Sequence, residues 1–191
     1  MTLTPYAPLS SAFVLINTAS AAKGGDASMA GSVEEVSRKL QAVGDKHIDL
    51  IHWLLGPNDM IAHVHAGDFK KLLKVIETRI LPLKNEVHNK IASTETLIVT
   101  SSKARKAFSG VANKPKQLNA WVLANTNSDN PDLGFQLMED KNVFYVGHVI
   151  GRYDMVLLIQ AGELPELMAA IDKTLRTKNY FANTDTRIVL M

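Results

Sequence analysis

The chain has 191 residues, of which 46% are hydrophobic and 21% are charged. This composition is that of an ordinary globular protein, long enough for one large domain or two small ones. The formal net charge of +2 excludes a strong overall field for nucleic acid. Cysteine is absent, which excludes disulfides, iron–sulfur clusters and thiolate metal sites, so any metal site would need His or carboxylate ligands.

The sequence predicts neither a membrane span nor a membrane partner, because it has no run of about 18 or more apolar residues. The stretch Ala7–Ala22 imitates a signal peptide, but it lacks a basic flank and overlaps a predicted strand. We therefore expect a cytoplasmic protein.

An internal repeat organises the sequence. The segments Gly56–Ile76 and Gly151–Ile171 align without a gap and carry seven identical residues, where average residue usage gives about one or two. A similar stretch closes each copy, Thr94–Val99 in the first and Thr184–Val189 in the second. The repeat therefore predicts two copies of one βαββαβ unit.

The elements of the first copy are predicted from apolar periodicity and turn residues. Apolar, β-branched runs indicate strands, and apolar residues at helical spacing indicate helices. Asp68 is expected to cap the second helix, and Pro57-Asn58 to form a hairpin turn. The predicted strands are Ala12–Thr18, Ile48–Leu55, Asp59–Ala66 and Ile91–Thr100, and the predicted helices cover 32–43 and 69–80.

The second copy repeats this order, with its elements at Leu118–Thr126, Leu133–Asp140, Val143–Ile150, Asp154–Ala161, Leu164–Leu175 and Thr184–Leu190. We predict an α+β fold in which tandem ferredoxin-like βαββαβ repeats form a pseudo-dimeric α+β barrel. The first repeat covers residues 1–100, a basic linker covers 101–117, and the second repeat covers 118–191. Exposed sheet edges predict a homo-oligomer.

Strand alternation places three histidines on one sheet face of the first copy. The alternate residues of the third strands are uniformly apolar and are expected to lie under the helices. The other face carries His52, His63 and His65, where the second copy has Gly147, Leu158 and Gln160. Three histidines suit a Zn, Cu or Fe ion, and one could ligate haem. The alternative is that these histidines are hydrogen-bonded or partly solvated residues of a sheet interface.

The sequence resembles the effector-binding domain of the Lrp/AsnC regulators. The residues that carry the resemblance are Trp53–Met60 with Ser93–Val99, and Val149–Met155 with Asn183–Val189. The resemblance implies sheets that dimerise, and an amino acid or similar metabolite bound at a subunit interface near the Gly-x-x-Asp turns. By position, the implied ligand-binding residues are Gly56, Asp59, Gly151, Tyr153 and Asp154. Turn geometry alone is the alternative explanation for the glycines and aspartates.

The resemblance does not extend to DNA binding. Regulators of this family begin with a helix-turn-helix, whereas only Met1–Ser11 precedes the first predicted strand here. Without a recognition helix we expect no sequence-specific DNA binding.

Three hypotheses for function follow. The first is a non-catalytic sensing or regulatory protein without cofactor, whose ligand carboxylate is held by turn amides or by Arg152. The second is a metal- or haem-binding α+β barrel protein or enzyme that uses His52, His63 and His65, with His148 as a further candidate. The third is a structural or adaptor protein. Colour or bound metal in the purified protein distinguishes the second from the first.

Overall fold

The structure is a computed structural model that describes residues 10–18, 29–44, 46–83, 91–105, 117–128, 130, 132–176 and 179–190. Contacts divide the chain into two compact units, with the division between Thr96 and Leu97. We call the elements up to Thr96 the N-terminal unit and those from Leu97 to Val189 the C-terminal unit. None of the helices in the described residues has the length and apolar character that crossing a membrane requires.

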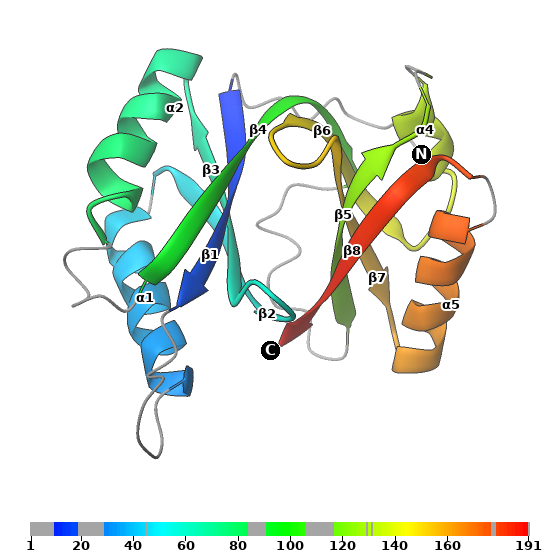
Figure 1. Cartoon of the computed structure of the whole chain (residues 1–191), viewed down its shortest axis with the longest axis horizontal. Coiled ribbons are helices and arrows are strands. Elements are labelled where there is room, and N and C mark those ends of the chain that lie inside the picture. The colour runs from blue at the N-terminus through cyan, green and yellow to red at the C-terminus, as the bar shows by residue number, and fades with distance from the viewer. Residues whose placement is uncertain are drawn as a thin grey trace. The chain divides into compact units, whose positions relative to one another are not determined.

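The N-terminal unit is an antiparallel sheet with two helices on one face (Figure 1). Strands β1 and β2 both pair with β3, in the order β1-β3-β2. Helix α1 packs on β1 and β2, and α2 packs on β1 and β3. The elements are β1 (Ser10–Thr18), α1 (Met29–Gly44), β2 (Ile48–Leu55), β3 (Met60–Ala66), α2 (Phe69–Val75), the π-helix η1 (Ile76–Ile80) and the start of β4 (Ile91–Ala104).

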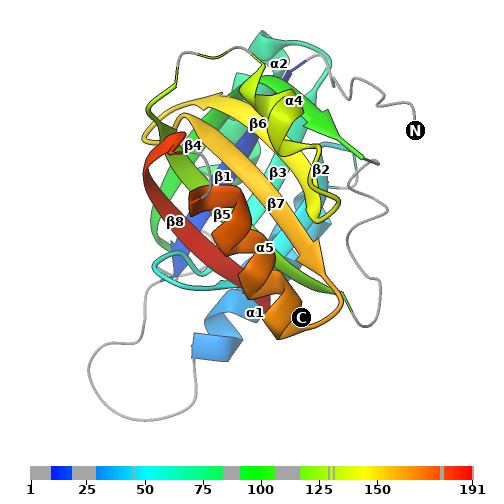
Figure 2. The same cartoon turned by 90° about the vertical axis from the view of Figure 1, so that its right-hand side faces the viewer.

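The C-terminal unit has the same succession of elements after the end of β4. Its strands pair antiparallel in the order β8-β5-β7-β6-β4, and α5 lies along β5 and β7 (Figure 2). The elements are β5 (Leu118–Thr126), α4 (Leu133–Leu137), β6 (Val143–Ile150), β7 (Met155–Ala161), α5 (Leu164–Arg176) and β8 (Phe181–Leu190). The predicted α+β class is therefore confirmed.

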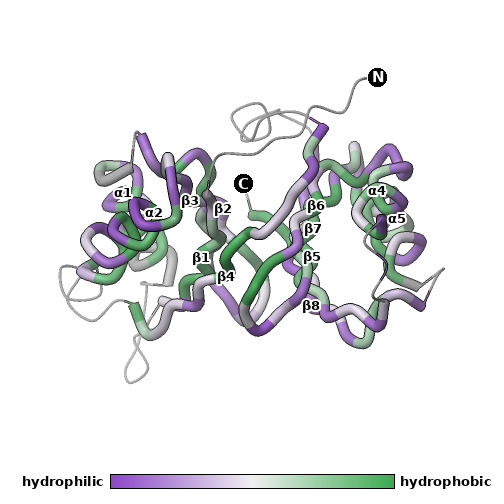
Figure 3. The backbone as a smooth tube through the Cα atoms, turned by 90° about the horizontal axis from the view of Figure 1, so that it is seen from above, coloured by the Kyte–Doolittle hydropathy of each residue, from purple (hydrophilic) through white to green (hydrophobic). Residues whose placement is uncertain are grey.

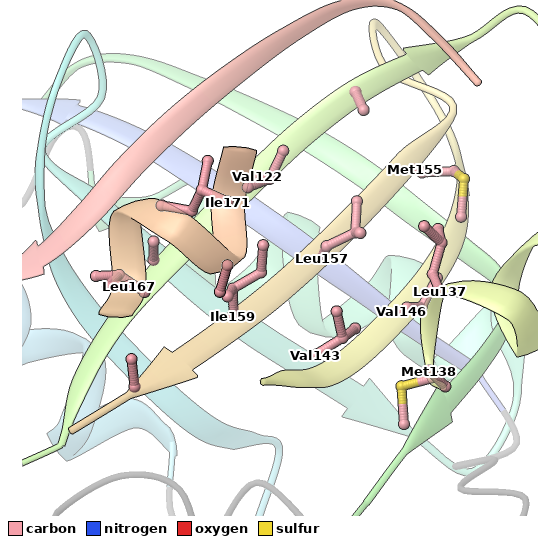
Figure 4. Packing of buried hydrophobic residues seen from close by; sticks show 14 of the residues in the cluster. Val122, Leu137, Met138, Val143, Val146, Met155, Leu157, Ile159, Leu167 and Ile171 are labelled. Atoms are coloured by element: carbon pink, nitrogen blue, oxygen red, sulfur yellow. The ribbon is translucent and has the colours of Figure 1, made fainter. Parts of the chain in front are cut away.

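Strand alternation determines which residues form the core of the C-terminal unit. As predicted, Met155, Leu157 and Ile159 of β7 lie under the helices, in one cluster with Leu167 and Ile171 of α5 (Figure 4). The helices show alternating hydrophobic and hydrophilic segments along the tube in Figure 3, as amphipathic helices that cover one face of a sheet do.

Two local details differ from or refine the sequence prediction. Asp68 caps α2 as predicted and accepts a hydrogen bond from the Lys71 amide at 2.7 Å. Strand β4 runs past Thr100 to Ala104 and pairs with β6, so the segment predicted as a linker begins in the sheet. Residues 106–116 of that segment lie outside the described residues.

Candidate functional site

The candidate site lies on the sheet face of the N-terminal unit that is opposite to Met60, Ala62 and Val64. In the register, His63 is paired with Leu50 on β2 and with Phe13 on β1. His52 is paired with Ile61, so it is diagonal to His63 rather than directly opposite, because a four-residue turn joins β2 to β3. We call this surface the histidine face and define it by Phe13, Leu50, His52, Ile61, His63 and His65.

A β-bulge brings a carboxylate to the histidine face. The register between β2 and β3 shifts between Ile48 and Leu50, which leaves Asp49 as the extra residue. A bulge re-aims the side chain that it carries, and Asp49 Oδ1 lies 2.6 Å from His63 Nδ1. Strict alternation would have placed Asp49 on the other face. Sequence reasoning therefore missed this residue.

The hydrogen bond to Asp49 fixes the imidazole of His63. A carboxylate accepts hydrogen bonds, so His63 donates from Nδ1, and Nε2 is its other ring nitrogen. The ring packs against Phe13 with centroids 4.8 Å apart, and only 1% of His63 is exposed. A metal-ligating histidine usually donates from its other ring nitrogen to a carboxylate, a backbone carbonyl or water, and the His63–Asp49 pair matches this pattern.

His52 is the second buried histidine of this face. It is 6% exposed, and burial lowers its pKa from 6.5 to about 4. Burial disfavours the charged form of a histidine. His52 is therefore a neutral imidazole at physiological pH, which can accept or donate a hydrogen bond or ligate a metal but carries no charge.

His65 is half-buried and belongs to a contact with a further histidine that the sequence prediction did not include. The rings of His47 and His65 lie 6.4 Å apart, and His47 Nδ1 lies 3.1 Å from the carbonyl oxygen of His65. Burial lowers the pKa of His65; the Asp49 carboxylate opposes this and raises it, and His63 and His47 lower it slightly further. Among the residues that the structure describes, no group of three or more His, Asp or Glu side chains could hold a metal ion together.

The Gly-x-x-Asp turns have a clear structural role. Gly56 and Gly151 adopt φ angles of 155° and 159°, which residues with a side chain rarely adopt. Asp59 Oδ2 accepts hydrogen bonds from the amide and the hydroxyl of Thr18, at 2.6 and 2.7 Å. Asp154 accepts the corresponding bond from the amide of Thr126 at 2.9 Å. The repeated motif thus joins the hairpin to the end of the first strand in each unit.

Tyr153 and Arg152 lie at the second of these turns. The hydroxyl of Tyr153 donates to Asp185 Oδ2 at 3.1 Å, and Asp185 is paired in turn with the buried Arg187. Burial, followed by the hydrogen bond to Asp185, raises the pKa of Tyr153. Arg152 is exposed beside the Tyr153 ring, 5.6 Å from its centroid. Ligand binding by these residues stays a prediction.

The C-terminal unit has no equivalent of the histidine face among its described residues. The position that aligns with His52 is Gly147, and a Cβ added there would lie 2.5 Å from the hydroxyl of Tyr145. The buried Tyr145 ring therefore occupies the space that a side chain at position 147 would need. His148 lies on the other side of β6, where it lines a small pocket of about 60 Å³ with Ser101, Lys103 and Gly134. Its pKa is lowered, mainly by burial and then by Lys103.

No protein-family model and no curated protein matches the sequence. Solved structures do match over nearly the whole chain. The siroheme decarboxylase NirDL matches with a TM-score of 0.64 and 8% identity, over 95% of this chain and 71% of that one. NirDL has also been solved in complex with an iron-uroporphyrin III analogue.

Two other matches cover more of their own chains. A mutant chlorite dismutase from Candidatus Nitrospira defluvii matches with a TM-score of 0.55 and 12% identity, over 95% of this chain and 91% of that one. An anthrone oxidase-like protein matches with a TM-score of 0.54 and 9% identity, over 100% of this chain and 95% of that one. At these identities the likeness shows a shared α+β fold.

These matches correct the family and the function inferred from sequence. The chain resembles chlorite dismutase and siroheme decarboxylase structures rather than the effector-binding domain of Lrp/AsnC regulators, so the sensing or regulatory role is wrong. The physical reason is that the motifs that carried the resemblance encode a turn. Gly56 and Asp59 shape a hairpin and hold a strand end, a structural role that does not depend on a bound ligand. The expectation of no cofactor, which rested on that role, loses its support.

Proposed function

We propose that the chain is an iron-porphyrin-binding protein with a catalytic role, and that His63 is the ligand to the iron. The observation that carries the proposal is the buried hydrogen bond from His63 Nδ1 to Asp49, 2.6 Å long, on a sheet face without helices. The shared fold with NirDL, which has been solved with an iron-uroporphyrin III analogue, supports the choice of an iron porphyrin over a bare metal ion.

The residues of the histidine face fit such a group. One imidazole is enough to ligate a porphyrin iron, whereas a bare ion held by protein side chains alone needs a cluster that the described residues do not form. The rest of the face is apolar at Phe13, Leu50 and Ile61, as the flat faces of a macrocycle require. Because His63 is 1% exposed, the side chains that cover it must move before a macrocycle can reach it.

The side chains have separable tasks in this proposal. Asp49 would hold the ring of His63 in one orientation and one tautomer, and it would make Nε2 a stronger donor to the iron. His52, which is neutral, would offer a hydrogen-bonding or second ligating nitrogen without adding charge to the site. When bound, an iron porphyrin would supply redox and Lewis-acid chemistry at its iron.

We also propose that both halves are ferredoxin-like copies in a protein of the dimeric α+β barrel type. The strand order β8-β5-β7-β6 in the C-terminal unit supports this, because it is the order of the βαββαβ fold. The repeated role of Asp59 and Asp154 supports a common origin of the two halves.

Titration of the purified chain with an iron porphyrin and with the same porphyrin without metal tests the proposal. We expect one equivalent of the iron porphyrin to bind with a shifted absorption band, at least about tenfold more tightly than the metal-free porphyrin. The physical reason is that only the iron form gains the bond to His63. Absorption and fluorescence-quenching titrations measure both affinities.

Equal affinity for the two porphyrins would show that the chain binds only the apolar macrocycle and would overturn the assignment of His63. No binding of either porphyrin to the folded chain would overturn the proposed function as a whole.

A further inference from the structure

A basic groove lies on the helix side of the N-terminal unit. It has a volume of about 500 Å³, within the range of sites for small organic ligands. Its walls come from the end of α1, the turn before β2, and one side of α2 and η1, and Figure 1 shows α1 and α2 as neighbours. The lining residues are Ala42, Lys46, His47, Lys71, Lys74, Val75, Thr78 and Arg79.

The groove concentrates positive charge that the chain as a whole does not have. Four of the lining residues are lysine or arginine, none is acidic, and the net charge of the entire chain is only +2. Lys71 is paired with Asp68 at 3.0 Å. Within the part of the chain that the structure describes, Lys46, Lys74 and Arg79 have no carboxylate partner.

The helix that forms one wall is irregular at the groove. Lys71, Lys74 and Thr78 follow one another at spacings of three and four residues, so they share a helical face. The segment Ile76–Ile80 is a π-helix, closed by a hydrogen bond of 2.9 Å from the amide of Leu81 to the carbonyl of Ile76. π-Helical turns are rare and occur frequently at functional sites. This one carries Thr78 and Arg79 into the lining.

We infer that this groove binds a small organic molecule that carries two or more anionic groups, phosphates or carboxylates. The charges of Arg79, Lys46 and Lys74 attract such a ligand, and the guanidinium of Arg79 can bind one group through two parallel hydrogen bonds. Ala42 and Val75 offer an apolar surface to its organic part. A nucleic acid fits less well, because the lining contains no Phe, Tyr or Trp on which a base could stack.

The inference stands apart from the proposed function. The groove is on the side of the sheet that carries the helices, and His63 is on the opposite face. His47 is the residue that connects the two regions, since it lines the groove and its ring lies 6.4 Å from that of His65.

Calorimetric titration with pyrophosphate and with citrate tests the inference. We expect one equivalent of at least one of them to bind, more weakly as salt rises. The double variant Lys74→Gln, Arg79→Gln is expected to weaken binding at least about tenfold, because it removes two charge-assisted contacts. The matched control is Lys141→Gln, Lys173→Gln, which removes two charges from lysines of the C-terminal unit that are 85% and 71% exposed. The control is expected to change the affinity less than about twofold.

Several outcomes would contradict the inference that the groove binds a small polyanion. They are no binding of either anion to the folded chain, an equal loss in the control, and tighter binding of a single-stranded oligonucleotide than of both small anions. The iron-porphyrin titration of the double variant separates the two proposals, because we expect it to match the wild type whether or not the groove binds anions.

Discussion

Replacing His63 by glutamine is expected to weaken iron-porphyrin binding by about 10–100-fold. Glutamine keeps a hydrogen-bond donor near Asp49, so the carboxylate stays paired, but an amide does not replace imidazole as a ligand to iron. Absorption titration of the wild type and the variant measures the loss. The shifted band of the complex is expected to change as well, because the axial ligand is removed.

A second variant and a control distinguish lost coordination from lost folding. His63→Ala leaves a cavity, and added imidazole is expected to fill it and restore the band of the wild-type complex. His148→Gln removes a half-buried histidine of the C-terminal unit and is expected to bind like the wild type. If His63→Gln binds as tightly as the wild type with the same spectrum, His63 is not the ligand.

The stability of the folded chain is expected to fall by about 2–3 kcal/mol between about pH 7 and pH 4.5 because of His52 alone. Its pKa is about 4 in the folded chain, against 6.5 for a histidine that burial does not perturb. Between these pKa values the unfolded chain binds a proton that the folded chain does not bind. The contribution of His52 to the free energy of unfolding is therefore fully present above about pH 6.5 and is lost as the pH falls towards 4.

Urea unfolding of the wild type and of His52→Gln at several pH values measures this contribution. Glutamine keeps hydrogen-bonding capacity but does not titrate, so the variant is expected to lose less stability on acidification. The pKa values of His65 and His148 are also lowered, so the free energy of unfolding of the variant is still expected to fall on acidification, but by less than that of the wild type. The same slope in both proteins would show that His52 is not held neutral by burial.

Much of the fold is predictable from the sequence because local sequence patterns determine most of its helices and strands. Alternation and turn residues place β2, β5 and β6 at their observed bounds, and Asp68 marks the start of α2. The repeat predicts the succession of elements in both halves, because identical turn residues impose the same geometry twice. The end of β4 was not predictable, since Ser101–Lys103 are polar, Ala104 is small, and this stretch continues the strand by pairing with β6.

The candidate site is predictable only in part, for a related reason. Alternation brings His52, His63 and His65 to one face, and the structure agrees with this. The partner of His63 depends on a bulge, which arises from the register between two strands and has no signature in the sequence around Asp49. The family inference failed because Gly56 and Asp59 form and stabilise a turn, and this role gives no information about a ligand.

The most direct test of the central claim is a resonance Raman spectrum of the ferrous iron-porphyrin complex. A histidine ligand gives an iron–nitrogen stretching band whose frequency rises when a carboxylate accepts a hydrogen bond from its other nitrogen. We predict this band in the wild type, a lower frequency in Asp49→Asn, and no band in His63→Gln. A wild-type complex without the band, or a band that persists unchanged in His63→Gln, would contradict the assignment of His63 and Asp49 as the iron site.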